Sequence, residues 1–145
     1  MNMMKNSKVQ VTIGDNSQFE FTYEGKNWKT NIEFEPYLEI RKKDKYEKYL
    51  FSEAGKIDTT YYTTGFSQGY QTVYSCFPFD KEFSFATSVE IDEYSNKVVA
   101  SILPLNDSLT NLHRIFWPSP IVFEKNEASA YSVMPIMQGC LVENG

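Results

Sequence analysis

Hydrophobic and polar residues alternate most regularly near the start of the chain. Apolar side chains recur at every second position in three runs, over 9–13, 19–23 and 28–32. Polar clusters that contain glycine, asparagine or acidic residues separate these runs. Because successive side chains of a β-strand point to opposite faces, the pattern predicts a three-stranded antiparallel meander with one apolar face. Trp28 lies on that face and is expected in the core.

Later segments also have the length and pattern of short strands. A charged turn at 42–45 predicts a hairpin over 38–51, with a helix over 44–54 as the alternative. Further strands are predicted over 59–64, 70–77, 82–92, 97–103, 121–123 and 131–142, and one short helix over 106–113. The segment 82–92 has the cleanest division into an apolar and a mainly polar face.

About ten predicted strands and at most one or two short helices indicate an all-β protein. We therefore predict an antiparallel β-sandwich, formed by a single domain over residues 9–145. Residues 1–8 are polar and are expected to form a flexible N-terminal segment. Strand-like sequence continues almost to the last residue, so we expect the sandwich to be the N-terminal part of a longer chain.

Composition narrows the classes of partner. The 145 residues carry a net charge of −5 at pH 7, and the short basic segment 41–45 is interrupted by an acidic residue. Nucleic-acid-binding domains usually have a basic face, so nucleic acid is not an expected partner. No apolar run approaches the roughly 20 residues that cross a bilayer. No secretory signal is visible, so we expect a cytoplasmic protein without a membrane partner.

Two cysteines and one histidine limit the metal and redox chemistry that the sequence supports. Cys76 and Cys140 lie in apolar, strand-like segments and are expected to be buried thiols. A disulfide would form only if the fold brings the two together. His113 is the only histidine and is expected at the surface or at a helix cap. The sequence therefore indicates no metal site and no cofactor.

Aromatic residues make up 16% of the sequence, and one central segment combines them with hydroxyl and amide groups. Sugars present apolar C–H faces on which tyrosine or tryptophan rings can stack, and amides can pair with sugar hydroxyls. Tyr62, Gln68, Tyr70 and Trp117 are therefore the candidate carbohydrate-binding residues. The alternative is that these rings pack between strands or in the core. Alternation places Tyr61 and Tyr62 on opposite faces, so at most one is expected to be available to a ligand.

Carboxylate pairs are candidates for acid–base chemistry. Glu90 and Asp92 share one face of a predicted strand, about 7 Å apart along it, and paired carboxylates act as acid and base in glycosidases. Glu33 and Glu35 have the same spacing. Glu90 and Asp92 end an outward face next to a turn, where carboxylates are simply solvated. That interpretation is favoured for both pairs, and no catalytic residue is assigned.

The C-terminal third of the sequence resembles a known family of domains. An I-x-x-P corner begins at Ile115, and a Y-x-x-x-P-x-x-x-G segment begins at Tyr131. These motifs resemble the galactose-mutarotase-like β-sandwich that precedes the catalytic barrel in glycoside hydrolases related to endo-α-N-acetylgalactosaminidases. The resemblance implies a non-catalytic sandwich that packs against a sugar-hydrolysing barrel. The catalytic carboxylates of that family belong to the barrel, so none is transferred to this chain.

Three functions follow from these patterns. The first is a non-catalytic module of a carbohydrate-active enzyme, with a C-terminal catalytic domain as its partner. The second is a stand-alone carbohydrate-binding module that uses exposed rings, and the third is a small enzyme with carboxylates on the sheet face. A large exposed apolar patch near residues 117–142, with no pocket, would favour the first, because such patches mark interaction sites. A platform of exposed rings beside a groove would favour the second, and two carboxyl groups about 5–10 Å apart in one pocket would favour the third.

Overall fold

A computed structural model describes residues 2–105, 112–119, 121–124 and 136–138. Within these ranges the chain forms thirteen β-strands, arranged in three sheets, and two 3-10 helices of three residues each. The predicted all-β sandwich with at most two short helices is therefore confirmed. No helix in the described ranges is long and apolar enough to cross a membrane.

The two larger sheets have five strands each. The first has the order β1-β2-β3-β4-β12 and contains β1 (Asn2–Lys5), β2 (Val9–Ile13), β3 (Phe19–Tyr23), β4 (Lys26–Thr30) and β12 (Ile121–Glu124). The second has the order β13-β10-β9-β8-β7 and contains β7 (Lys56–Thr63), β8 (Ser67–Phe77), β9 (Asp80–Asp92), β10 (Val98–Pro104) and β13 (Ile136–Gln138). Neighbouring strands are antiparallel except β13, which runs parallel to β10.

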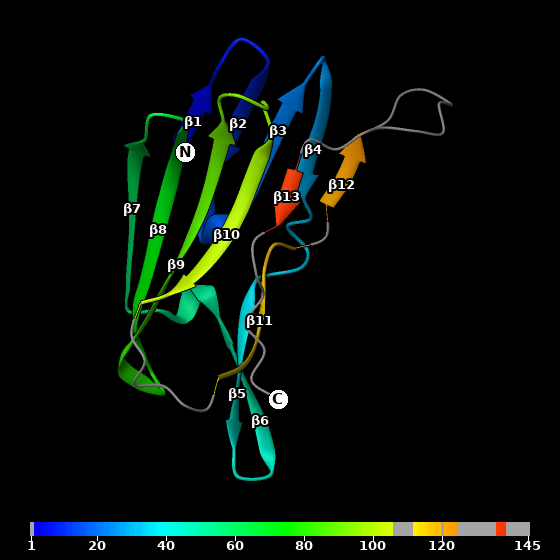
Figure 1. The fold of residues 1–145 in the computed structure, drawn as a ribbon. Helices are drawn as coiled ribbons and strands as arrows, with labels where there is room; N and C mark the ends of the chain where they lie inside the picture. The colour runs from blue at the N-terminus through cyan, green and yellow to red at the C-terminus, as the bar shows by residue number, and fades with distance from the viewer. Residues whose placement is uncertain (1, 106–111, 120, 125–135, 139–145) are drawn as a thin grey trace.

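These two sheets pack face to face and enclose an aromatic core (Figure 1). Val11, Phe21 and Trp28 project into it from the first sheet, and Phe85 and Val89 from β9 of the second, all at most 1% exposed. Burial of one such side chain contributes about 1.5–3 kcal/mol. The predicted meander and the core position of Trp28 are therefore confirmed.

A third sheet, in the order β11-β5-β6, continues the fold beyond one end of the sandwich (Figure 1). It contains β5 (Tyr37–Lys42), β6 (Lys45–Leu50) and β11 (Leu112–Phe116). Leu38 and Ile115 of this sheet belong to the same buried core as the larger sheets. The predicted hairpin over 38–51 is confirmed and the alternative helix is wrong, because Lys42 pairs with Lys45 across a tight turn. The first 3-10 helix, η1 (Asp15–Ser17), joins β2 to β3, and the second, η2 (Phe51–Glu53), follows β6.

The N-terminal segment departs from the expected flexibility. Residues 2–5 form β1 and pair with β2 from Asn2 opposite Ile13 to Lys5 opposite Gln10. Met4 is only 3% exposed and belongs to the core. The expectation for 1–8 is thus corrected for these four residues, because one buried side chain and a paired backbone hold them on the sheet.

The expected burial of Cys76 is wrong. The pairing of β8 with β9 shifts between Ser75 and Phe77, and Cys76 has a positive φ of 60°. This irregularity breaks the alternation of side chains along β8 and leaves the thiol exposed. Cys140 lies outside the described residues, as does most of the strand predicted over 131–142, of which β13 covers 136–138.

The expected helix over 106–113 is corrected at its last two positions. Leu112 and His113 belong to β11, where Leu112 pairs with Ile40 of β5, and residues 106–111 lie outside the described ranges. His113 is half-buried rather than a helix cap. Its Nε2 lies 3.5 Å from Glu39 Oε1, and its ring centre lies 4.5 Å from that of Tyr46.

Candidate functional site

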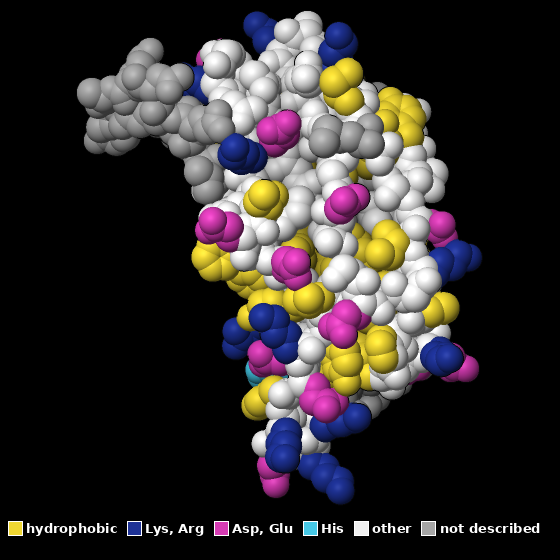
Figure 2. Space-filling model, turned by 180° about the vertical axis from the view of Figure 1, so that it is seen from behind, with side chains coloured by type: hydrophobic (Ala, Val, Ile, Leu, Met, Phe, Trp, Pro, Cys, Tyr) yellow, Lys and Arg dark blue, Asp and Glu magenta, His cyan; other side chains and the backbone are white. Residues whose placement is uncertain are grey.

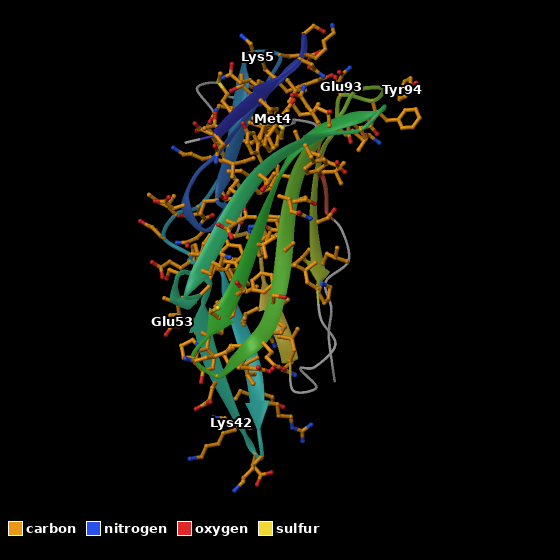
Figure 3. All side chains as sticks on the ribbon, turned by 90° about the vertical axis from the view of Figure 1, so that its left-hand side faces the viewer. Met4, Lys5, Lys42, Glu53, Glu93 and Tyr94 are labelled. Carbon is orange, nitrogen blue, oxygen red and sulfur yellow. The ribbon has the colours of Figure 1, made fainter. Side chains whose placement is uncertain are left out.

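One end of the sandwich collects polar and aromatic side chains from three elements: β1, the start of β8 and the turn between β9 and β10. Figure 3 shows Lys5, Glu93 and Tyr94 at this end, with Lys42 at the opposite end of the molecule. Tyr94 points away from both sheets. Two of the four predicted sugar-binding residues, Gln68 and Tyr70, lie in this region.

Gln68 is the centre of a hydrogen-bond network that ties β8 to β1. Its Nε2 donates to the backbone oxygen of Lys5 at 2.9 Å and to Glu93 Oε1 at 2.7 Å. Its Oε1 accepts from the hydroxyl of Tyr61 at 3.2 Å. Both amide N–H groups and the amide oxygen therefore already have protein partners.

Tyr70 lies on the same face of β8 as Gln68. Its hydroxyl donates to the backbone oxygen of Met3 at 3.2 Å. Its ring meets the ring of its cross-strand neighbour Tyr61 edge to face, with ring centres 5.2 Å apart. Tyr70 thus joins the second sheet to β1. Its ring packs between strands, which is the alternative to sugar binding that the sequence left open for this residue.

Tyr62 occupies the opposite, outer face of the second sheet, as alternation predicts for the neighbour of Tyr61. Its ring lies across Gly69, where an added Cβ would come within 2.7 Å of the ring. Its hydroxyl donates to Glu90 Oε2 at 2.9 Å. Partial burial, and then the bond to Glu90, raise the pKa of Tyr62 to about 12. Tyr62 therefore covers a glycine and connects β7 to β9 across β8.

Trp117 lies in the core, at 3% exposure. Its Nε1 donates to the backbone oxygen of Ser17 at 3.0 Å, and its ring centre is 6.1 Å from that of Phe19. Of the two alternatives for Trp117, the structure thus places it in the core. The four predicted residues do not form one surface: Gln68 and Tyr70 lie together, Tyr62 lies on the other face of the sheet and Trp117 is buried.

The carboxylates of β9 hold the local structure. Glu90 accepts a second hydroxyl, from Ser67 at 3.0 Å. Asp92 accepts the backbone N–H groups of Tyr94 at 2.9 Å and Ser95 at 3.2 Å. The N–H donors of Ser95 and Tyr94 hold the pKa of Asp92 below its ordinary value. Both carboxylates accept hydrogen bonds from the protein itself and so fix the local structure.

A polar cleft of about 640 Å³ opens between β2 with η1 and β7 with β8. Its inner wall carries the buried hydroxyl of Ser17, 2.7 Å from Tyr74 Oη and 2.6 Å from Thr87 Oγ1. Asn16 and Ser17 have positive φ angles of 57° and 60°, and this bend turns the Ser17 side chain into the core. Burial, with a smaller contribution from the charge of Asp15, raises the pKa of Tyr74 to about 12.

A second hollow, of about 720 Å³, is more apolar and lies beside the third sheet. It is lined by Ile32, Glu33, Phe34, Glu35, Tyr37, Lys48, Leu50 and Phe116. We call this surface the apolar groove. Ile32 is 78% and Phe34 49% exposed. The rings of Tyr37 and Phe116 stack with centres 5.1 Å apart, and Lys48 Nζ lies 4.4 Å from the centre of the Tyr37 ring. Figure 2 shows exposed hydrophobic side chains among acidic and basic ones on the face that it presents.

Local hydrogen bonds hold the rim of the apolar groove in place. β4 ends at Thr30, two residues before the alternation ends, because Asn31 starts a turn: its Oδ1 accepts from Glu33 N at 2.9 Å and its backbone oxygen from Phe34 N at 3.1 Å. The backbone oxygen of Phe34 accepts from Ser119 Oγ. The sequence pattern predicted that Ile32 lies on the buried face of a strand. Asn31, a residue type that favours turns, was the feature of the sequence that indicated the strand ends before Ile32.

The fold has close counterparts among solved structures. No family model and no curated protein matches the sequence. The α-N-acetylgalactosaminidase NagBb from Bifidobacterium bifidum, in complex with Gal-NHAc-DNJ, matches 84% of this chain with a TM-score of 0.74 and 22% identity. The ligand-free structure of the same enzyme matches 85% with a TM-score of 0.72 and 23% identity. The chain spans only 19% of each of these enzyme chains. At this identity the likeness concerns the fold.

Proposed function

We propose that this chain is a non-catalytic β-sandwich domain of a larger glycoside hydrolase, and that it packs against the catalytic domain through the apolar groove. The fold likeness to 19% of a glycosidase chain supports the first part of the proposal. Because one fold serves many functions, the likeness is no evidence that the domain docks through the apolar groove. That part rests on the groove.

The observation that carries the docking role is a preformed apolar surface with a charged rim. Ile32 and Phe34 stay exposed although their backbone is fixed by the Asn31 turn, so little conformational entropy is lost when a partner covers them. Full burial of an exposed side chain of this size contributes about 1.5–3 kcal/mol, and Phe34, which is already about half covered, would contribute correspondingly less than Ile32. Glu33, Glu35 and Lys48 surround these side chains, which matches the apolar centre and polar rim of domain interfaces.

The first test is the intact mass of the natural gene product, measured by mass spectrometry. We expect a mass well above the 16.8 kDa of this chain, because the proposal requires a catalytic domain in the same polypeptide. A natural product of about 16.8 kDa would contradict it.

The second test compares backbone hydrogen exchange in the complete gene product and in this chain alone. Amides of residues 31–35 and 37 should exchange at least about tenfold more slowly in the complete product, because the partner domain excludes water from the groove. The exposed turn at Glu24 and Gly25, which lies outside the groove, is the control and should not change. Equal exchange of residues 31–35 and 37 in both proteins would exclude docking at this surface.

A further inference from the structure

Two exposed aromatic rings lie side by side at the end of the sandwich that carries Gln68 and Glu93. Phe66, in the turn between β7 and β8, is 62% exposed, and Tyr94, in the turn between β9 and β10, is 78% exposed. Their ring centres are 5.4 Å apart and their planes are inclined by 35°. The two rings contact each other and remain largely exposed to solvent, so together they present an apolar surface at this end.

Both turns are fixed by side-chain hydrogen bonds. Thr64 Oγ1 accepts from the backbone N–H of Phe66 at 3.1 Å and of Ser67 at 3.0 Å. Asp92 Oδ1 accepts from the backbone N–H of Tyr94 at 2.9 Å. The backbone N–H of Glu93 donates to the backbone oxygen of Phe66 at 2.8 Å and joins the two turns. The rings therefore sit on a prearranged support, which lowers the entropic cost of binding.

The turn between β9 and β10, which carries Tyr94, also carries the hydrogen-bonding side chains of Glu93 and Asn96. Asn6 Nδ2 donates to Glu93 Oε2 and to Asn96 Oδ1, at 3.0 Å in both cases, and Glu93 Oε1 accepts from Gln68. A carboxylate has about four acceptor positions and an amide oxygen two. Glu93 and Asn96 therefore keep acceptor capacity toward solvent after these bonds, which suits the hydroxyl donors of a sugar.

We propose that Phe66 and Tyr94 form a carbohydrate-binding platform, on which a pyranose ring stacks its C–H face while Glu93 and Asn96 accept hydrogen bonds from its hydroxyls. A sugar suits this end of the molecule because it combines an apolar face with a rim of hydroxyl donors, and the two joined turns carry both exposed rings and acceptor groups. The platform shares no residue with the apolar groove, so sugar binding and domain docking can be tested independently of each other. A bound sugar would keep a glycan chain near the molecule without any chemistry at this site.

The test is an NMR titration of the 145-residue chain with three separate probes: methyl β-D-galactopyranoside, N-acetylgalactosamine and cellotriose. At least one sugar should shift the ring protons of Phe66 and Tyr94 in a saturable way, because stacking replaces water at the ring faces, and the C–H protons of that sugar should shift upfield in the ring current. Galactitol, which has the hydroxyls of galactose but no ring, should cause no saturable shift. The double variant Phe66→Ala/Tyr94→Ala should weaken binding at least about tenfold.

Tyr46→Ala is the matched control, because Tyr46 is also an exposed tyrosine, at 53%, and lies in β6 of the third sheet. This variant should bind the sugar with unchanged affinity. Absence of saturable ring shifts with all three sugars overturns the proposal. Binding that survives the double variant also overturns it, since the sugar would then occupy another surface. A chemical-shift map of each variant verifies that the fold is retained.

Discussion

Three buried hydroxyls form a compact polar group inside an otherwise aromatic core. Ser17 lies between Tyr74 and Thr87, within hydrogen-bond distance of both, and all three side chains are at most 2% exposed. A buried hydroxyl without a partner costs about 1–3 kcal/mol. The left-handed backbone at Ser17 is tolerated because it brings the hydroxyl to its two partners and the carbonyl to Trp117.

The raised pKa of Tyr74, about 12, predicts how stability depends on pH. An unfolded tyrosine titrates near pH 10, so between about pH 10 and 12 the unfolded chain loses this proton while the folded chain keeps it. The unfolded state then binds fewer protons, and the free energy of unfolding falls as pH rises. The fall for one such group is at most about 1.4 kcal/mol per pH unit.

Urea unfolding of the wild type and of Tyr74→Phe between pH 8 and 11.5 measures this contribution. The variant should be less stable at pH 8 by about 1 kcal/mol, because Tyr74 loses its bond to Ser17. Its stability should then decline less steeply above pH 10, so that the two curves converge. Parallel curves over the whole range would show that Tyr74 does not titrate abnormally.

At the scale of elements, the N-terminal segment tests whether residues 2–5 form a strand packed on the sheet or a flexible end. Met4 is 3% and Met3 52% exposed, although they are neighbours on the same strand. Met4→Ala should destabilise the protein by about 2–5 kcal/mol through the cavity that it leaves. Met3→Ala is the control and should change the free energy of unfolding by less than about 0.5 kcal/mol. Chemical denaturation measures both values, and equal small effects would mean that residues 2–5 do not pack on the sheet.

Alternation of polar and apolar residues made the long antiparallel elements predictable. β2, β3, β5 and β9 each bury one face, so the period-2 pattern appears directly in the sequence. The pattern fails at β1, where a single buried side chain, Met4, leaves no alternation to detect. It also fails at Cys76 and Ile32, because an irregularity in β8 and the Asn31 turn each interrupt the strand geometry that the pattern assumes.

The surfaces were harder to predict than the strands. The sequence indicated an aromatic, amide-rich segment and correctly placed Tyr61 and Tyr62 on opposite faces. It did not distinguish rings that pack between strands, such as Tyr70, from rings carried on turns, such as Phe66 and Tyr94. That difference depends on which elements lie opposite each ring, and β1 covers Tyr70 only after the chain has folded.

At the scale of the whole molecule, one core joins all three sheets. Trp28 in β4, Tyr74 in β8 and Leu38 in β5 belong to the same buried cluster. The protein should therefore unfold in one cooperative transition, in which tryptophan fluorescence and far-ultraviolet circular dichroism give the same urea midpoint. Separate midpoints would show that the third sheet, with β11 leading to Trp117, unfolds independently.

The position of β7 at the outer edge of the second sheet has a consequence for how the protein behaves in concentrated solution. Its charged residues, Lys56 and Asp58, lie at its beginning and pair with each other at 3.7 Å. Residues 59–63 are uncharged threonines and tyrosines with high β-propensity. Because charges along an edge strand discourage intermolecular pairing, this uncharged half of β7 is the part of the described edge where another chain can add and begin aggregation.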